Sequence, residues 1–122
     1  MQIYKNWLIA NGVKFEESSL GLSFKYQGAG FILWNNAHDQ QYLALSMPNI
    51  WAINGEELKV LRVANKINCE IKAVKTVVRD NFVWLGVEMF IDSTPDIDDF
   101  MERILDILLE SRMKFSFEMH NG

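Results

Sequence analysis

A stretch that is apolar on both sides most constrains what this chain can fold into. Residues 82–91 are apolar or aromatic at nearly every position, which is typical of a buried strand. As a strand, the stretch places aliphatic side chains on one face and aromatic ones on the other: Val83, Leu85, Val87, Met89 and Ile91 against Phe82, Trp84 and Phe90. Residues 31–34 are also apolar on both faces. Both faces of a sheet that contains such strands must be covered.

The helices that the sequence predicts are too few to cover both faces easily. Three helices, one of them short, accompany a predicted sheet of five or six strands. We therefore expect part of the second face to pack against another chain, because burying one aromatic side chain is worth about 1.5–3 kcal/mol. Monomers also avoid a contiguous exposed apolar patch. The alternative is a complete monomer, in which the first and last helices lie on opposite faces of the sheet.

The first half of the chain predicts a helix followed by strands. Residues 3–11 have helical spacing and end before Gly12, which suits a left-handed cap. The face that this helix would bury carries Ile3, Trp7 and Ala10. Alternating patterns then predict strands, at residues 13–16, 22–26, 31–34 and 42–47. We expect the last three to form a meander that ends at Pro48, with Trp51 in the connection that follows.

A second helix is predicted from Asn54 to about Asn68. Asn54 and Glu57 have the spacing of a capping box, in which each side chain satisfies a backbone N–H of the other residue. The apolar positions at helical spacing are Leu58, Leu61, Ala64 and Ile67. Two β-rich runs follow, at residues 71–78 and 82–91. The turn-forming residues Arg79-Asp80-Asn81 join them and predict a hairpin.

The last helix is predicted to be long. Ser93-Thr94-Pro95-Asp96 is a strong start signal, with a hydroxyl cap, a proline and an acid in the first turn. One face carries Ile97, Phe100, Met101, Ile104, Leu105 and Leu108, and the pairs Asp99–Arg103 and Glu110–Lys114 have salt-bridge spacing on the other. Residues 113–119 fit either a terminal strand or a continuing helix that leaves some apolar surface exposed. The sequence thus predicts one α+β domain over residues 1–122, with a single, mostly antiparallel sheet.

Composition excludes several classes of function. The chain of 122 residues holds 12 basic and 16 acidic residues, and its net charge of −4 disfavours nucleic acid as a partner. Cys69 is the only cysteine, so an intrachain disulfide is impossible and a cytoplasmic location is expected. We find neither an export signal nor an apolar stretch of the roughly 20 residues that a membrane-spanning helix needs. A soluble protein that does not bind membranes is therefore expected.

The candidate catalytic and metal-binding patterns all have simpler structural interpretations. His38 and Asp39 lie in a polar connection, and Gly21-Leu22-Ser23-Phe24-Lys25 lacks the final glycine and the helix of a nucleophile elbow. Gly28-Ala29-Gly30 precedes a strand rather than a phosphate-binding helix. The acids Asp96, Asp98, Asp99 and Glu102 suit the start of a helix, and Cys69 is interpreted as a small buried side chain. We expect no catalytic residue, no cofactor and no metal, and hence no enzyme.

The aromatic residues are the better candidates for a binding role. Tryptophan combines a large contact area with a low entropic cost of binding, and the chain has four tryptophans. Trp51, between Pro48 and Asn54, is expected to be partly exposed. The predicted partner or dimer surface consists of Trp34, Trp51, Phe82, Trp84 and Phe90.

The predicted order of elements resembles the secretion-chaperone-like fold of type III secretion chaperones and of the bacterial YbjN family. The similarity is greatest at Asn65-Lys66-Ile67-Asn68, at the following hairpin, and at the acidic helix start Asp96-Ile97-Asp98-Asp99-Phe100. The resemblance implies a bacterial cytoplasmic protein without catalytic residues, often dimeric. It would act through protein contacts, either by binding an extended segment of a partner or as a regulator. No family site residue carries over to this chain.

Two functions from different classes remain. The first is a non-enzymatic protein-binding module, chaperone-like or regulatory, that forms a homodimer and recognises a peptide or protein. The second is a small-molecule-binding or enzymatic domain with a pocket between the sheet and the C-terminal helix. A cleft with converging polar groups would favour the second. A filled core at that place would favour the first.

Overall fold

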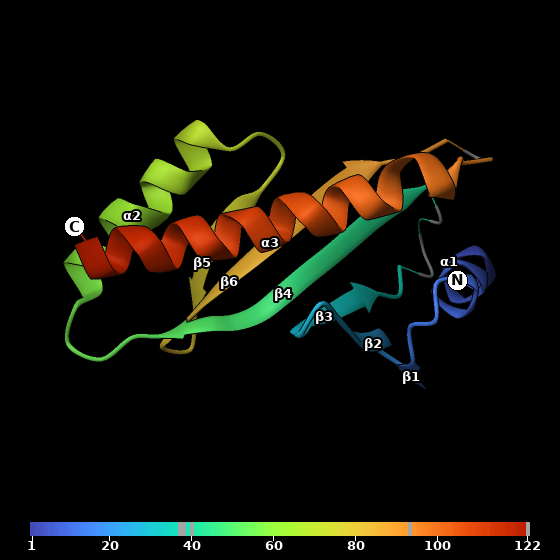
Figure 1. Cartoon of the computed structure of the whole chain (residues 1–122), viewed down its shortest axis with the longest axis horizontal. Coiled ribbons are helices and arrows are strands. Elements are labelled where there is room, and N and C mark those ends of the chain that lie inside the picture. The colour runs from blue at the N-terminus through green and yellow to red at the C-terminus, as the bar shows by residue number, and fades with distance from the viewer. Residues whose placement is uncertain (37–38, 40, 93, 122) are drawn as a thin grey trace.

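The computed structural model describes residues 1–36, 39, 41–92 and 94–121. It contains three helices and a six-stranded, fully antiparallel sheet (Figure 1). The elements in chain order are α1 (Gln2–Ala10), β1 (Phe15–Ser18), β2 (Gly21–Tyr26), β3 (Ala29–Trp34), β4 (Tyr42–Ala52), α2 (Glu57–Glu70), β5 (Lys75–Arg79), β6 (Phe82–Phe90) and α3 (Ile97–Asn121). The strand order is β1-β2-β3-β4-β6-β5. The predicted α+β class and element order are confirmed.

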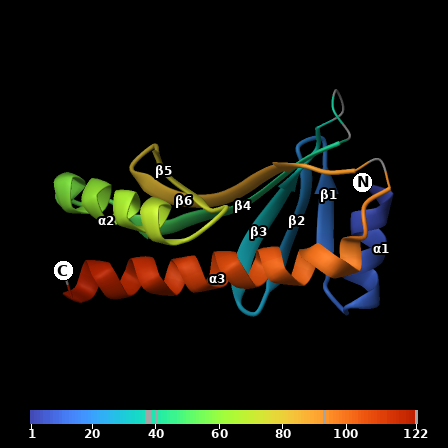
Figure 2. The same cartoon turned by 90° about the horizontal axis from the view of Figure 1, so that it is seen from above.

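All three helices lie on the same face of the sheet. Side chains of α1 and α3 share one core with the inward residues of β2, β3, β4 and β6, and α3 runs along the sheet (Figures 1 and 2). A second cluster joins α2 to the C-terminal half of α3 and to Val83 of β6. The alternative, in which the first and last helices cover opposite faces, is therefore wrong. Helices α1 and α3 both pack on the apolar side of the first strands, because the other side of these strands carries polar residues such as Ser23 and Lys25.

Helix α1 ends as predicted but buries a different face. Gly12 has a φ of 70°, and the N–H of Val13 donates to the carbonyl of Leu8, which is the hydrogen bond of a glycine-capped helix end. The buried side chains are Tyr4, Trp7 and Leu8, whereas Ile3 is 41% exposed. The buried face of α1 is thus rotated by about one residue from the predicted one, since Tyr4 and Leu8 supply more apolar contact than Ile3 and Ala10.

Strand β4 continues through Pro48, which was expected to end it. The register between β4 and β6 shifts between Met47 and Trp51, so the proline lies in an irregular part of the ladder. A β-bulge accommodates proline because the bulged residues do not all need to donate to the neighbouring strand. Trp51 consequently lies in a strand, opposite Val83, and not in a connection.

Helix α2 also differs from its prediction. It begins at Glu57, and no side chain caps its first turn by a hydrogen bond, so the predicted capping box does not form. Its buried residues are Val60, Val63, Ala64 and Ile67. Leu58 and Leu61 are exposed, because the side of α2 that faces α3 and β6 is the one that carries the valines.

The hairpin and the long last helix are confirmed, although the first strand of the hairpin begins at Lys75 and not at residue 71. Asp80 and Asn81 have φ values of 50° and 67°, as a tight two-residue turn between β5 and β6 requires. Residues 113–119 are helical, and Phe115 and Met119 are buried while Met113 and Phe117 remain exposed. Of the predicted start signal, Ser93 lies outside the described residues. No described helix is both long enough and apolar enough to cross a membrane.

The ion pairs of α3 are not the predicted ones. Among the described residues, Lys114 pairs with Glu70 and Glu118 pairs with Lys66, both across to α2. Neither Asp99 with Arg103 nor Glu110 with Lys114 forms a pair, and Lys114 contacts Glu70 of α2 instead. These bridges fix α2 alongside the C-terminal half of α3.

Candidate functional site

No described helix covers the side of the sheet that points away from α1, α2 and α3 (Figure 2). We call this side the helix-free face; its outward residues include Ile32, Trp34, Ser46, Val77, Arg79 and Trp84. The register aligns them across the sheet, with Ile32 opposite Ser46, Ser46 opposite Gly86, and Val77 opposite Trp84. Ser46 and Gly86 are small. They leave room above the centre of the sheet for larger side chains from either side.

Two tryptophans and an arginine form a row on this face. The rings of Trp34 and Trp84 stack with centroids 6.5 Å apart and an interplanar angle of 22°. The guanidinium of Arg79 lies 4.3 Å from the centroid of a Trp84 ring, within cation–π range. The indole N–H of Trp34 donates to the hydroxyl of Ser46 at 2.9 Å. These contacts hold the row in one arrangement before any partner arrives.

A second aromatic pair lies at one end of the same face. Tyr42 and Phe90 make an edge-to-face contact with ring centroids 5.5 Å apart. The hydroxyl of Tyr42 donates to the carboxylate of Glu88 at 2.8 Å, and the ammonium of Lys75 contacts the same carboxylate at 3.1 Å. The hydrogen bond from Tyr42 has the larger effect on Glu88 and, together with the one from Lys75, lowers the pKa of Glu88. The same hydrogen bond raises the pKa of Tyr42.

The helix-free face is hollowed over the first strands. A depression of about 800 Å³ extends across β1, β2, β3 and the middle of β4. Its lining includes the outward residues Lys14, Glu16, Ser23, Lys25, Gly30, Ile32 and Pro48. The small residues Ser23 and Gly30 form its low part, and a side chain added at Gly30 would meet open space. The depression is thus a broad groove beside the tryptophan row, with lysines at its rim.

Four of the five predicted binding residues lie on the helix-free face. Phe90 is 78% exposed and Phe82 is 37% exposed, whereas Trp34 and Trp84 are half-buried against each other. Trp51 points the other way, and its ring packs against Phe115 and His120 of α3. The structure thus brings four of these residues to one surface, while Trp51 is half-buried on the helical side, in keeping with its expected partial exposure. Their role in binding stays a prediction.

Sequence reasoning missed the polar members of this surface. Arg79 was assigned to the turn before β6, and neither Ser46 nor Lys25 was considered a site residue. Alternation gave a usable signal for Arg79, because it lies two residues after Val77 and therefore on the same side of a strand. The contact between Arg79 and Trp84 depends on the β5–β6 register, which the hairpin turn sets.

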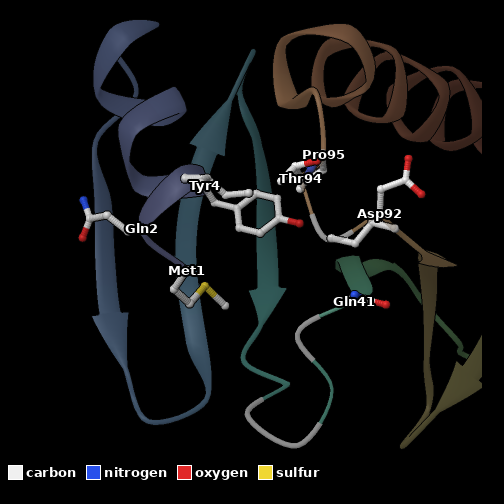
Figure 3. Close-up of a pocket in the computed structure, with 9 residues that line it drawn as sticks. Met1, Gln2, Tyr4, Gln41, Asp92, Thr94 and Pro95 are labelled. Carbon is white, nitrogen blue, oxygen red and sulfur yellow. The ribbon is translucent and has the colours of Figure 1, made fainter.

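A pocket of about 640 Å³ lies on the helical side of the molecule, beside the start of α1 (Figure 3). Its walls come from the first turn of α1, from Gln41 before β4, and from Asp92, Thr94 and Pro95 before α3. The hydroxyl end of Tyr4 is directed toward the segment that carries Asp92 (Figure 3), and it has no hydrogen-bond partner among the described residues. Burial raises the pKa of Tyr4. The pocket does not lie between the sheet and the body of α3, where the small-molecule alternative requires one.

The other chemical candidates are dispersed. His38 lies outside the described residues. Ser23 is an exposed residue within β2, and Gly21 is needed for packing, because a side chain there would meet the carbonyl of Leu33 at 2.0 Å. Cys69 is exposed near the end of α2, which corrects its interpretation as a buried side chain. The described residues contain no cluster of three or more acids, histidines or cysteines that could hold a metal ion.

Comparisons with solved structures identify the fold. The crystal structure of YbjN from E. coli, a proposed transcription regulator, superposes with a TM-score of 0.69 at 13% identity, over 93% of this chain and 87% of YbjN. An uncharacterised protein from Methanothermobacter thermautotrophicus superposes with a TM-score of 0.68 at 12% identity, over 98% of this chain and 96% of that one. No protein-family model and no curated protein matches the sequence significantly. The predicted resemblance is thus confirmed at the level of structure: the chain has the YbjN-like α+β fold.

Proposed function

We propose that this protein is a non-enzymatic protein-binding module, chaperone-like or regulatory, that forms a homodimer and recognises a peptide or protein on its helix-free face. The observation that carries the proposal is the tryptophan row of Trp34, Trp84 and Arg79 on a sheet face without a helix. Large aromatic and arginine side chains dominate the energetics of protein interfaces. Because the row is already stacked, little side-chain entropy is lost when a partner binds.

The packing between the sheet and α3 supports this proposal over the small-molecule alternative. That space is filled by residues that are at most 1% exposed, among them Leu45, Leu85, Met101, Leu105 and Leu108. A ligand pocket there would require displacing several of these side chains, each of which contributes about 2–5 kcal/mol of packing. The helix-free face needs no such rearrangement to receive a partner.

A separate apolar stripe supports the homodimer. Leu109, Met113 and Phe117 follow one another at four-residue spacing along the outer side of α3, and Met113 and Phe117 are 73% and 63% exposed. They line a shallow groove of about 620 Å³ with Asp106 and Glu110 at one end. Two copies of such a stripe fit each other when the helices run antiparallel about Met113, which is the geometry of an isologous contact. This arrangement leaves both helix-free faces open.

Light scattering at micromolar concentration tests the homodimer. The wild-type protein is expected at twice the chain mass of 14.2 kDa. Met113→Lys should shift it to the monomer, because a charge would be buried at the centre of the contact. Arg79→Gln serves as the control and should leave the dimer intact. A folded wild-type monomer, or a dimer that Met113→Lys does not weaken, would contradict this part of the proposal.

Affinity capture from the organism that encodes the protein, followed by titration with the purified partner, tests recognition. The partner should bind the wild type and the Phe117→Ala variant with affinities within about twofold, since Phe117 lies on α3. Trp84→Ala should weaken binding by at least about 2 kcal/mol, the loss expected for a central interface residue. Circular dichroism checks that the variant is folded. Equal affinity of the Trp84→Ala protein would show that recognition occurs elsewhere.

A further inference from the structure

The charge of the helix-free face is opposite to that of the protein as a whole. Its outward strand residues include the basic Lys14, Lys25, Lys75 and Arg79 and the acidic Glu16 and Glu88, and Asp39 lies near Tyr42 at one end of the face. The complete chain holds 12 basic and 16 acidic residues. The acidic excess is therefore carried by the other surfaces, such as the start of α3 with Asp98 and Asp99. Such a distribution attracts an acidic partner to this one face and repels it from the rest.

Most of these cations are available to a partner. Lys75 is paired with Glu88, but Lys14, Lys25 and Arg79 make no ion pair among the described residues. Arg79 uses the flat side of its guanidinium on Trp84, which leaves the N–H groups at its edge free to donate to a carboxylate. Stacking on the indole fixes the orientation of this fork in advance. A two-point hydrogen bond to a carboxylate is the contact that such an arginine makes best.

The aromatic geometry favours a peptide over nucleic acid. Single-stranded nucleic acid binds by stacking its bases on the flat faces of exposed aromatic rings. Here Trp34 and Trp84 cover each other, and Arg79 covers a face of Trp84 as well. The row lies beside a groove of about 800 Å³, which suits aliphatic and aromatic side chains of a peptide.

We propose that the partner of the helix-free face is an acidic peptide segment with apolar side chains between its carboxylates. The inference rests on the proposed function and specifies its ligand. Carboxylates of the segment bind Arg79 on one side and Lys14 and Lys25 on the other. The intervening apolar side chains occupy the groove over Ile32 and Pro48 and contact the edge of the tryptophan row. An extended segment rises about 3.3 Å per residue, so one short peptide is long enough to reach both kinds of contact.

A displayed library of random peptides, of about ten residues as suits an extended segment, tests the inference. Peptides are selected on the wild-type protein and counter-selected on the folded Trp84→Ala variant. The selected sequences are expected to contain more Asp and Glu than Lys and Arg, with apolar residues between the acids. Replacing the acids of the best peptide by their amides should weaken binding about tenfold, and raising the salt concentration should remove most of that difference.

Charge variants of the protein provide the matched comparison. Arg79→Gln and Lys25→Gln should each reduce the preference for the acidic peptide over its amide form by about threefold or more. Arg103→Gln should leave it unchanged, because Arg103 is exposed on α3. Selected peptides without an acidic excess would overturn the inference while leaving the proposed function intact. Failure to select any peptide that prefers the wild type to Trp84→Ala, or binding of oligothymidylate in its place, would overturn both.

Discussion

At the scale of single residues, the helix-free face depends on small side chains beneath large ones. Ser46 supplies the acceptor for the indole N–H of Trp34, and the side chain of Trp34 then lies against Trp84. The sequence assigned both tryptophans to the predicted partner or dimer surface, because strand alternation is local. It did not predict their stacking, since Trp34 and Trp84 come from strands that meet only through β4 between them.

Ser46→Ala tests the hydrogen bond beneath the row. The substitution leaves a half-buried indole N–H without its acceptor, so the free energy of unfolding should fall by about 1 kcal/mol. Ser23→Ala is the matched control, because Ser23 is exposed on the neighbouring part of the same face. Urea denaturation measures both. A loss as small as that of Ser23→Ala would show that the bond contributes nothing to stability.

The carboxylate of Glu88 predicts a dependence of stability on pH. Its pKa is lowered from the ordinary value of 4.5 by the hydrogen bonds from Tyr42 and Lys75. A lowered pKa in the folded state stabilises the fold above 4.5, and this contribution is lost as the pH falls through the lower folded-state pKa. The stability difference between wild type and Glu88→Gln, measured by urea denaturation, should therefore shrink between about pH 6 and pH 3. A difference that stays constant over this range would contradict the assignment.

At the scale of elements, periodicity located every helix and strand but assigned the wrong face to two helices. Leu58 and Leu61 have helical spacing, yet the side of α2 that faces the core carries Val60, Val63 and Ile67. Both sets repeat at helical intervals, and only the position of α3 and β6 decides between them. The limits of β4 were missed for a similar reason, because β6 continues to pair beyond the irregularity at Pro48.

The C-terminal half of α3 is tested by two phenylalanines that a strand would place on one face. In the helix, Phe115 is 1% exposed and packs against Trp51, whereas Phe117 is 63% exposed. Phe115→Ala should lower the free energy of unfolding by about 3–5 kcal/mol. Phe117→Ala should change it by no more than about 0.5 kcal/mol in the monomeric Met113→Lys background. Similar losses from both substitutions in urea denaturation would be inconsistent with this helix.

Asn68 joins the end of α2 to the edge strand β5. Its side-chain oxygen accepts the N–H of Thr76 at 2.7 Å, and its amide donates to the carbonyl of Thr76 at 3.2 Å. Both hydrogen bonds reach past the connection that follows the helix to the strand beyond it. Asn68→Ala should lower the free energy of unfolding by about 1–3 kcal/mol, since two backbone groups lose their partner. Asn65→Ala, at an exposed position one turn earlier, is the control in the same urea titration.

At the scale of the whole molecule, helices on a single side leave the two surfaces with different uses. The helical side buries the aliphatic residues of the sheet and carries the acidic excess, while the helix-free face keeps the aromatic row and the unpaired cations. The amount of apolar surface on the second face was predictable from the sequence. The side on which α1 would pack was not, because it depends on tertiary contacts among α1, α3 and the first strands.

The four tryptophans allow a direct test of where recognition occurs. Trp34 and Trp84 lie on the helix-free face, whereas Trp7 is on the buried side of α1 and Trp51 packs against α3. Each indole N–H gives one signal in a nitrogen–proton correlation spectrum, so titration with the best selected peptide reports on all four sites together. Recognition on the helix-free face should shift the Trp34 and Trp84 signals to saturation while those of Trp7 and Trp51 stay in place. Saturation of the protein with unchanged Trp34 and Trp84 signals would contradict it.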